Sequence, residues 1–475
     1  MNNKMKQNTP TKDYDVVVVG SGTAGLVAGL RAAELDHSVA VLEKAPEKHQ
    51  GGHTRFSESF RVPSVGTKLE QYGYEFAVDD YTKEDFYRDI MNQTNGKADD
   101  ELATVLVENA GETVEWLTAA GVDWRMEPLA VGYTAARTWF DGEKYVATLT
   151  EAAENEGADF WFETEAVALH RSSSGEVVGV TARGPDGKIR FNSNAVILAA
   201  GDYGSSDEKR VRYYGRGYDE MNVRGSRYNT GEALMMAESA GANLVGQWGG
   251  AHMALIDAAS PDVEGGANRV DGYQYGVILN DHGERFVDEG EDARAHTYAK
   301  FGRLIFEQPN HVAYIVLDSK IHDLVRATGP SNPIRADTFE ELLEATGCSD
   351  PRTGVETIRE FNDSCNPDEF EPKTLDGNST TGLSPEKSNW AIPIDEPPYY
   401  AYAVTGGITF SFGGVKIDTD GTVIDTADRS ILGLYAAGNS TGELFYDNYP
   451  GGTAQTNAAV YGKIAAESAS QYIQS

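Results

Sequence analysis

The pattern of apolar residues near the start of the chain predicts a strand, a helix and a second strand. Residues 16–19 form a β-branched run, an Ala- and Leu-rich segment reaches about Leu35, and residues 39–42 form a second apolar run. Short apolar runs separated by a helix-length segment are typical of parallel strands that are buried on both faces. We therefore expect an α/β fold built on a parallel sheet.

Similar patterns continue along the chain. Helical spacing recurs over residues 82–92, 99–120, 145–156 and 230–241, and strand patterns recur over residues 159–169, 176–183, 188–192 and 194–200. From about Gln247 the pattern changes to short strands, at residues 277–280, 284–287 and 313–317, which fit a second, mixed domain. Residues 350–387 are rich in Pro, Asp, Ser and Thr, and we expect them to form a surface excursion without visible chemistry.

The C-terminal part returns to the first pattern. Strands are predicted over residues 414–418 and 431–437, and Gly451-Gly452-Thr453 opens a helix of small residues that reaches about Ser468. If this strand and helix complete the first domain, one domain is interrupted by another. The predicted segments are residues 12–246 and 412–475 for the first domain and 247–411 for the inserted one.

A glycine-rich turn joins the first strand to the first helix. It reads Gly20-Ser21-Gly22-Thr23-Ala24-Gly25, and the second strand ends on Glu43. In a dinucleotide-binding turn the first glycine permits the bend, the second admits a pyrophosphate and the third lets the helix pack on the strand. The acid is placed to bind a ribose 2′-hydroxyl. These features together predict nucleotide binding.

Composition narrows the possible partners. The chain has 475 residues, 40% of them hydrophobic, which predicts more than one core, and its net charge is −34. A surface this acidic repels phosphate backbones, so no nucleic-acid partner is expected. An anionic substrate would need a local arginine cluster to overcome this field.

The two cysteines and the lack of long apolar stretches bear on location. Cys348 and Cys365 have no metal-ligand partners in register and are expected to be free thiols, with no metal site. Residues 1–13 are polar, and no apolar run approaches the roughly 18 residues that a membrane helix needs. We expect a cytoplasmic protein without an integral membrane segment.

Four separated motifs now coincide: Gly20 to Gly25 with Glu43, Ala199-Ala200-Gly201-Asp202, Leu434-Tyr435-Ala436-Ala437-Gly438, and Pro450-Gly451-Gly452-Thr453. Together they resemble the FAD-dependent family that includes fumarate reductase and succinate dehydrogenase flavoprotein subunits, 3-ketosteroid dehydrogenases and tricarballylate dehydrogenase. The resemblance covers about residues 13–468. It implies a Rossmann-like FAD-binding domain of the glutathione-reductase type, interrupted by a smaller α+β capping domain.

Two further stretches resemble the tricarballylate dehydrogenase branch most. They are Gly51-Gly52-His53-Thr54-Arg55 with Arg61, and Asn448-Tyr449-Pro450-Gly451-Gly452. By the resemblance, the first glycine turn and Glu43 hold the ADP half of FAD, and the C-terminal glycines with the following helix N-terminus surround the flavin. The implied cofactor residues are Gly20, Gly22, Thr23, Ala24, Gly25, Glu43, Lys44, Gly51, Gly52, His53, Thr54, Val167, Ala200, Gly201, Gly438, Asn439, Gly452 and Thr453.

His53 raises the question of how FAD is attached. Succinate dehydrogenases carry a histidine before a threonine at the matching place and join it covalently to the flavin 8α-methyl, whereas soluble fumarate reductases carry Asn there. His53 can therefore form the covalent link or only hydrogen-bond near the flavin. Because the flanking sequence follows the non-covalent branch, we expect non-covalent FAD.

Oxidising a saturated C–C bond beside a carboxylate or ketone requires a hydride acceptor, a group that removes the α-proton and donors that stabilise enolate-like charge. The stretch from Asn280 to Arg294 resembles the one leading to the family's proton-transfer arginine, with one extra residue before Arg294. Arg294 could instead form an ion pair with Glu289 or Asp292. His252 falls where the family often has a substrate-facing histidine, and it could instead be a packed core residue.

The chain departs from the fumarate reductase pattern at the substrate. The second substrate histidine is absent from residues 407–414, where Thr409 is a substrate-binding candidate, and Tyr449 replaces the carboxylate-clamping arginine. Arg55, Arg61 and Arg269 are candidates for replacement charge, unless they form surface ion pairs. Tyr449 also resembles the tyrosine with which ketosteroid enzymes polarise a ketone, and Tyr298 or Tyr449 could handle the proton in place of Arg294.

The leading hypothesis is an FAD-dependent enzyme that desaturates a C–C bond next to the carboxylates of a small di- or tricarboxylate, as in tricarballylate to cis-aconitate, or runs the reverse reduction. The catalytic candidates are Arg294, Tyr449 and His252, and the substrate candidates are Arg55, Arg61, Arg269, Tyr298 and Thr409. An external electron carrier is expected, because no haem or iron–sulfur cysteine motif is present. The alternatives are a cyclic-ketone dehydrogenase with FAD, a nicotinamide-dependent dehydrogenase and a non-catalytic flavin-binding protein.

Overall fold

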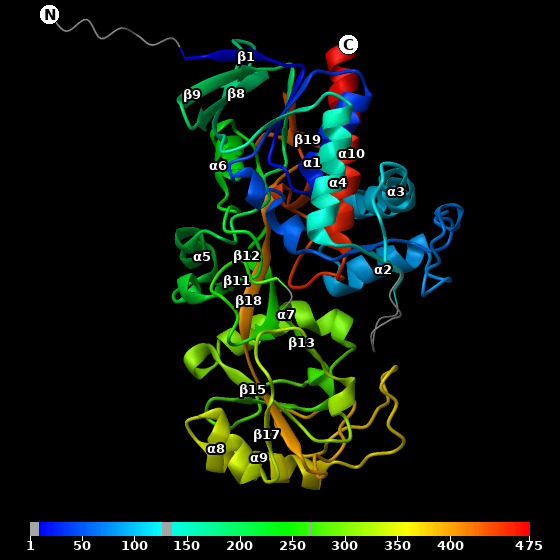
Figure 1. Ribbon diagram of the computed structural model, residues 1–475, viewed down its shortest axis with the longest axis vertical. Helices are drawn as coiled ribbons and strands as arrows, with labels where there is room; N and C mark the ends of the chain where they lie inside the picture. The colour runs from blue at the N-terminus through cyan, green and yellow to red at the C-terminus, as the bar shows by residue number, and fades with distance from the viewer. Residues whose placement is uncertain (1–8, 126–134, 267) are drawn as a thin grey trace, which may run out of the picture.

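A computed structural model describes residues 9–125, 135–266 and 268–475 of the chain. Its upper half, as seen in Figure 1, is built on a six-stranded sheet of these residues in the order β19-β20-β10-β2-β3-β6. The parallel members are β2 (Val16–Val19), β3 (Val39–Leu42), β6 (Asp159–Trp161), β10 (Ala195–Leu198) and β20 (Ser430–Ala436), and β19 (Thr422–Ile424) is antiparallel. The predicted parallel α/β sheet is confirmed.

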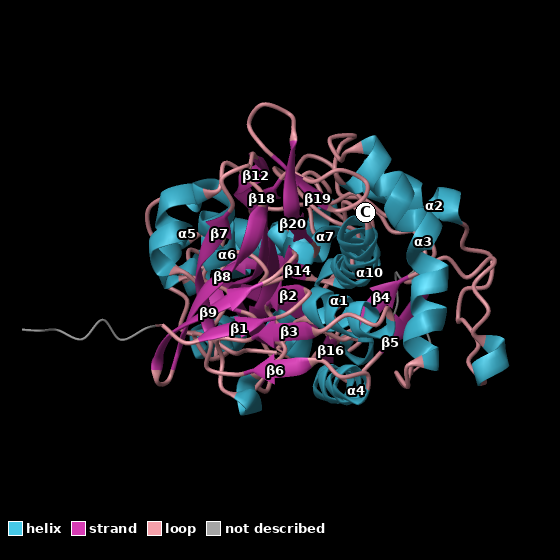
Figure 2. Cartoon of the chain, turned by 90° about the horizontal axis from the view of Figure 1, so that it is seen from above, coloured by secondary structure: helices cyan, strands magenta, loops and turns pink. Residues whose placement is uncertain are grey.

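Helices from both ends of the chain cover one face of this sheet (Figure 2). Helix α1 (Thr23–Glu34) packs between α4 (Gly142–Asn155) and α10 (Thr453–Gln474). The approach of α10 to α1 is close, since a Cβ at Gly462 would lie 2.6 Å from the Ala24 carbonyl oxygen. The last helix therefore packs directly on the helix that the first glycine turn opens.

A smaller sheet lies on the other face. Its order is β1-β9-β8-β7, with β1 (Thr11–Asp13), β7 (Glu165–Arg171), β8 (Val177–Gly184) and β9 (Gly187–Asn192). The prediction of one strand over residues 159–169 was wrong, because the chain leaves the large sheet after Trp161 and enters the small sheet at Glu165. Glu163, at φ 51°, makes the turn between the two sheets.

The inserted part contains a second, mixed sheet, in the order β11-β18-β15-β14, with β12 and β17 also pairing with β18. The long strands β12 (Leu244–Asp257) and β18 (Tyr399–Val415) run antiparallel from the upper half into this lower half (Figure 1). Both predicted domain boundaries fall within these two strands. The other members are β11 (Asn222–Val223), β14 (Val277–Asn280), β15 (Ala313–Leu317) and β17 (Ile334–Ala336), and helix α7 (Arg294–Phe306) packs on β12 and β18.

Two predictions for the inserted part were wrong. Residues 284–287 form no strand, and Arg285 makes only an isolated bridge with Leu279. The expected surface excursion begins with a helix, α9 (Pro351–Ser364), which packs on α8 (Phe339–Thr346) by an apolar face. The Pro at its first turn and the Asp350 cap start this helix, so a Pro- and Asp-rich composition masked a helix start.

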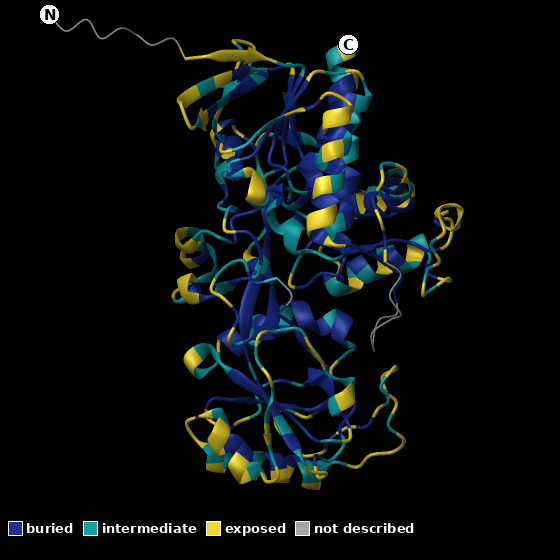
Figure 3. Cartoon of the chain, viewed as in Figure 1, coloured by how far each residue is buried: buried dark blue, intermediate teal, exposed yellow. Residues whose placement is uncertain are grey.

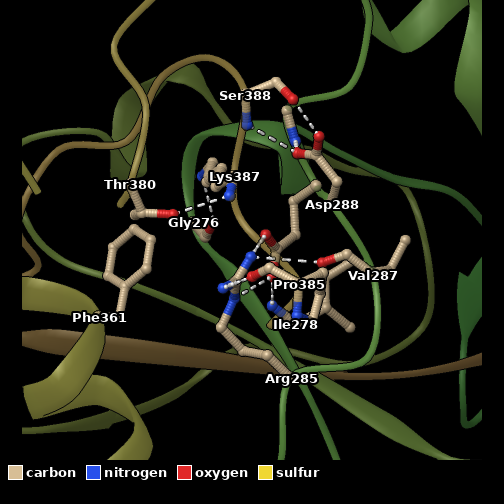
Figure 4. Close-up of polar contacts among 12 residues, drawn as sticks. Gly276, Ile278, Arg285, Val287, Asp288, Phe361, Thr380, Pro385, Lys387 and Ser388 are labelled. Atoms are coloured by element: carbon tan, nitrogen blue, oxygen red, sulfur yellow. Dashed lines mark hydrogen bonds and ion pairs between the residues drawn. The ribbon is translucent and has the colours of Figure 1, made fainter. Parts of the chain in front are cut away.

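The end of that excursion is held to the sheet by buried charges (Figure 4). The Lys387 ammonium is fully buried and donates to the Gly276 carbonyl at 2.5 Å, and burial lowers the pKa of Lys387 to about 8. Arg285 forms an ion pair with Glu289 at 2.6 Å and also donates to the Pro385 carbonyl. These contacts fix the loop that closes the lower sheet.

The remaining elements surround these sheets, and Figure 3 shows buried strands under helices whose outer faces are exposed. They are β4 (Ser59–Arg61), β5 (Arg137–Trp139), β13 (Val270–Asp271), β16 (Arg326–Ala327), α2 (Lys83–Gln93), α3 (Asp100–Ala119), α5 (Asp207–Tyr214) and α6 (Glu232–Ser239). Both cysteines are free, as predicted. Among the described helices, none has the length and apolar character required to span a membrane.

Candidate active site

A large cavity extends from the carboxyl ends of β2, β3 and β10 to β12 and β18, the long strands that lead into the inserted part. Its empty volume is about 1470 Å³, which includes the open space at its mouth. Its wall combines residues of the N-terminal glycine turn, the C-terminal glycine loop and the inserted part. The cavity therefore lies where the interrupted fold brings distant segments together.

The end of the cavity near α1 has the features of a dinucleotide site. Gly20 has φ 102°, and a Cβ at Gly25 would lie 2.0 Å from the Gly20 carbonyl oxygen, so both positions require glycine. The first intrahelical bond of α1 runs from the Leu26 N–H to the Gly22 carbonyl, so the N–H groups before it have no partner within the helix, and that of Thr23 donates to the Thr54 hydroxyl at 2.8 Å. A pyrophosphate placed there would meet the positive end of the helix dipole.

Glu43 is held rigidly beside this turn. One carboxylate oxygen accepts from the Ser21 N–H at 3.2 Å and from the Ser21 hydroxyl at 2.6 Å, and the other accepts from the Ala45 N–H at 2.8 Å. The side chain is buried yet lines the cavity. Its position fits the ribose-binding acid of a dinucleotide fold.

The N-terminus of α10 also faces the cavity. Its N-cap Gly452 has φ 87°, and Gly452, Ala454, Gln455 and Ala458 line the wall. The Thr23 hydroxyl of α1 donates to the Gln455 side chain at 2.5 Å, which ties the two helix starts together. Two helix N-termini therefore present partial positive charge to one elongated cavity.

His53 lies between the two ends of the cavity. Its Nδ1 accepts the Ser226 N–H at 2.8 Å, so the neutral ring carries its hydrogen on Nε2. The Nε2 atom has no hydrogen-bond partner in the part of the chain that the structure describes. Burial, and then the charge of Arg224, lowers the pKa of His53 to about 4. The ring is therefore neutral at ordinary pH.

Arginines gather at the opposite end of the cavity: Arg137, Arg224, Arg269 and Arg294 line it. Arg269 pairs with Glu58 at 2.7 Å, and Arg294 pairs with Asp271 at 2.6 Å. Burial opposes the ionisation of Asp271, but Arg294 and Arg269 outweigh it and hold the pKa of Asp271 below its usual value. Arg294 and Asp271 are therefore a charged pair in the cavity wall.

An aromatic group lies next to these arginines. The His252 ring is 2% exposed, and its centroid lies 5.0 Å from that of Tyr298, 4.8 Å from that of Tyr449 and 5.4 Å from that of Phe410. Among the described residues neither ring nitrogen has a hydrogen-bond partner. Burial, with the charges of Arg224 and Arg294, lowers the pKa of His252 well below 6.5, so this histidine is neutral.

The two tyrosines of this group touch through their hydroxyls. Tyr298 and Tyr449 lie 2.7 Å apart at their oxygen atoms, and the Arg294 guanidinium carbon lies 4.2 Å from the Tyr298 ring centroid. Burial, and then Tyr298, raises the pKa of Tyr449 well above 10. Tyr449 is therefore a neutral hydroxyl that can donate a hydrogen bond.

The sequence profile of the FAD binding domain family matches residues 15–455. The chain belongs to the FAD-dependent fumarate reductase and succinate dehydrogenase flavoprotein family. It is 30% identical to the urocanate reductase of Eggerthella lenta over 97% of this chain and 75% of that protein. It is 27% identical to the probable fumarate reductase Ifc3 of Shewanella frigidimarina over 98% of this chain and 76% of that protein.

Solved structures agree with this assignment. The open conformation of a flavocytochrome c3 fumarate reductase superposes with a TM-score of 0.75 at 25% identity, over 98% of this chain and 79% of that chain. A 3-ketosteroid Δ1-dehydrogenase from Sterolibacterium denitrificans shares the fold, with a TM-score of 0.76 at 19% identity, over 97% of this chain and 99% of that chain. With the family match and the named relatives, the protein is an FAD-dependent oxidoreductase of CH–CH or C=C bonds.

FAD fits the cavity of this flavoprotein. The glycine turn and the start of α1 suit its pyrophosphate, Glu43 suits its ribose, and the start of α10 suits its reduced ring. When bound, FAD supplies hydride transfer. The implied cofactor residues that line the cavity are Gly20, Gly22, Thr23, Ala24, Glu43, Lys44, Gly52, His53, Thr54, Ala200, Gly201, Gly438, Asn439 and Gly452. Gly25, Gly51 and Thr453 are not part of the lining, but each is next in sequence to a residue that is. Val167 lies one residue beyond Ala166, which does line the cavity.

The substrate candidates divide into two groups. Arg269, Arg294, His252, Tyr298, Thr409 and Tyr449 all line the cavity. Arg55 is not part of the lining and forms a surface ion pair with the exposed Glu143 at 2.7 Å. Arg61 is fully buried, pairs with Asp89, and donates to the Gly451 carbonyl at 3.0 Å, so it supports the C-terminal glycine loop.

Arg137 and Arg224 line the cavity but were not among the sequence candidates. Arg224 follows β11, a strand of only two residues, which no periodicity could reveal. Arg137 begins a strand of three residues that pairs with β4. The one available signal was the position of Arg224 before Gly225, in a glycine-punctuated segment that leads to a predicted helix.

Proposed function

We propose that this flavoenzyme oxidises a saturated C–C bond beside the carboxylates of a small di- or tricarboxylate, or reduces the corresponding double bond. The observation that carries the proposal is the arginine cluster of Arg224, Arg269 and Arg294 beside His252, in one cavity with the cofactor site. In a protein with a net charge of −34, such a cluster supplies the local positive field that an anionic substrate needs. Tricarballylate to cis-aconitate is the model reaction.

Each side chain has a role in this proposal. The arginine cluster as a whole supplies the positive charge that attracts the substrate carboxylates, and the neutral His252 ring orients one of them through a single N–H donor. In the reducing direction the Arg294 guanidinium donates a proton to the substrate carbon. In the oxidising direction it first passes a proton to ionised Asp271, at 2.6 Å, and then accepts the α-proton. The Tyr298–Tyr449 pair is the alternative proton route. Packing of His252 against Tyr298, Tyr449 and Phe410 keeps water from this end of the cavity.

The relatives support the carboxylate assignment. Fumarate and urocanate, named in the two relatives above, both carry a double bond beside a carboxylate. Neither name fixes the substrate of this chain. The choice of a tricarballylate-like acid depends on the resemblance of residues 51–55 and 448–452 to that branch.

A second candidate substrate is a cyclic ketone. The specific observation in its favour is the Tyr298–Tyr449 hydroxyl pair, 2.7 Å apart, because a neutral hydroxyl at this place can polarise a ketone oxygen. The shared fold of the ketosteroid enzyme is compatible with this reaction. A ketone, however, leaves the arginine cluster without an anionic partner, and for that reason the carboxylate is preferred.

Anaerobic bleaching of the bound flavin distinguishes the two. Purified protein is mixed with tricarballylate, succinate, a cyclic 3-ketone or no substrate, and the oxidised flavin absorbance near roughly 450 nm is followed. Bleaching by a carboxylate alone supports the proposal, and bleaching by the ketone alone refutes it.

An external carrier must then reoxidise the flavin. A cytoplasmic location stays a prediction.

A further inference from the structure

Arg224 lines the cavity without an ion pair of its own in the described part of the chain, since the Glu58 carboxylate, which also acts on its charge, pairs with Arg269. Its Nε donates to the Asn268 side-chain oxygen at 3.2 Å and its Nη1 donates to the Thr409 hydroxyl at 3.4 Å, and both acceptors are neutral. Within residues 9–125, 135–266 and 268–475, no carboxylate forms an ion pair with it. By contrast, Arg269 and Arg294 have Glu58 and Asp271 at 2.7 and 2.6 Å.

The position of Arg224 is fixed by the backbone on both sides. Val223 pairs with Ile408 of β18, and the Arg224 N–H donates to the Ile408 carbonyl at 2.7 Å. The next residue, Gly225, passes so close to His53 that a Cβ there would lie 2.4 Å from Nδ1. Arg224 therefore stands at the arginine end of the cavity, held between the His53 side and Thr409.

The surroundings of the Arg224 guanidinium make its positive charge energetically unfavourable, and an anionic ligand would relieve this penalty. Burial, with the nearby Arg269, lowers the pKa of Arg224, and the flanking histidines His53 and His252 are neutral. A cation in a cavity wall with only neutral hydrogen-bond partners is unfavourable until an anion binds. Among the described residues no acceptor is hydrogen-bonded to Nη2, so one edge of the fork is available to a ligand in the cavity.

We propose that Arg224 binds a substrate carboxylate, in place of the guanidinium that the fumarate reductase pattern has at the position of Tyr449. Asn268 and Thr409 hold the guanidinium in orientation, and its remaining edge faces the carboxylate. This inference rests on the proposed function, because it assigns one residue of that site to an anionic group. It makes Arg224 the residue that selects an acid over a neutral ketone.

The test compares three variants of the FAD-loaded enzyme. Arg224→Met removes the charge, and Arg224→Lys keeps the charge but loses the planar guanidinium with its paired N–H donors. The control, Arg227→Met, removes a nearby exposed arginine that pairs with Glu264 outside the cavity. Malonate, which has no C–C bond that can be desaturated, is titrated while the flavin spectrum is recorded, and malonamide is the neutral control. KM and kcat are measured with the carboxylate that bleaches the wild-type flavin fastest.

We expect the malonate Kd and the substrate KM to rise about 100-fold in Arg224→Met and about tenfold in Arg224→Lys, with kcat reduced much less and malonamide unaffected. Arg227→Met should match wild type. Unchanged malonate Kd and KM in Arg224→Met would overturn the inference and leave the proposed function intact. A wild type that is bleached only by ketones would overturn both.

Thermal unfolding separates a binding role from a structural one. Without ligand, Arg224→Met should unfold at the wild-type temperature or a few degrees above it, because a charge without an anionic partner has been removed. A lower unfolding temperature together with loss of FAD would indicate a structural role and count against the inference. The Arg224→Lys variant, which preserves the charge, then decides whether binding still depends on the fork.

Discussion

The hydroxyl oxygens of Tyr298, on α7 of the cap, and Tyr449, in the C-terminal glycine loop, lie 2.7 Å apart. This contact joins residues 151 positions apart in the sequence across the cavity. It closes the aromatic wall around His252 and places a polarised hydroxyl pair beside the Arg294–Asp271 ion pair. The contact thus links the cap to the domain that holds the cofactor.

Substitution of Tyr449 by Phe tests what that pair does. If the substrate is a carboxylate held by arginines, the variant should lose about tenfold in kcat and change KM little, because one neutral hydrogen bond is removed. If the hydroxyl polarises a ketone, the loss should be about 100-fold or more. Steady-state kinetics give both constants, and Tyr446→Phe, at a residue outside the cavity lining, serves as the matched control.

Substitution of Asp271 by Asn tests the ion pair with Arg294. We expect kcat to fall by one to two orders of magnitude, since the proton partner is lost. The folded protein should lose about 3 kcal/mol, because a buried arginine is left without its full charge balance. Stopped-flow reduction and denaturant unfolding measure the two effects. Normal reduction kinetics in the variant would exclude Asp271 from proton transfer.

The same pair predicts a pH dependence of stability. The pKa of Asp271 is lowered in the folded state relative to the 3.8 of an ordinary aspartate. Its contribution is therefore fully present above that value and is lost as the pH falls through the folded-state pKa. The difference in unfolding free energy between wild type and Asp271→Asn should be constant near neutral pH and shrink in acid. A difference that grows toward low pH would contradict this sign.

His53 predicts non-covalent FAD. Its Nδ1 accepts the Ser226 N–H, so Nε2 carries the hydrogen and lacks the lone pair that an attack on the flavin methyl requires. Acid denaturation followed by filtration should release all the yellow colour into the filtrate. Colour that stays with the protein, and is lost in His53→Asn, would show that His53 is the attachment site.

Close packing of α10 on α1 predicts an effect of Gly462→Ala. The added Cβ would lie 2.6 Å from the Ala24 carbonyl oxygen, so the helices must move apart. We expect a loss of about 2 kcal/mol in stability and weaker FAD binding, because both helix starts line the cofactor site. Ser468→Ala, on the same helix, is the control. Unfolding curves and FAD titration of the apoprotein provide the measurements.

Much of the cofactor site was predictable because it depends on residues that lie close together in the sequence. The bend at Gly20, the tight contact at Gly25 and the acid at Glu43 follow from residue types at fixed spacing, and the apolar runs around them define the strands. The return of the pattern near residues 431–453 was enough to predict that the chain ends fold together.

Only the tertiary structure decided which arginines share the cavity. Arg55 and Arg61 stand next to cofactor motifs in the sequence, yet neither lines the cavity, since Arg55 pairs with Glu143 at the surface and Arg61 pairs with Asp89 in the interior. Arg224 reaches the cavity because a strand of two residues pairs with β18, nearly two hundred positions away. The position of a charged side chain depends on the long-range strand pairing that places its backbone and on a partner that offsets its desolvation. Neither can be read from the residues next to it in the sequence.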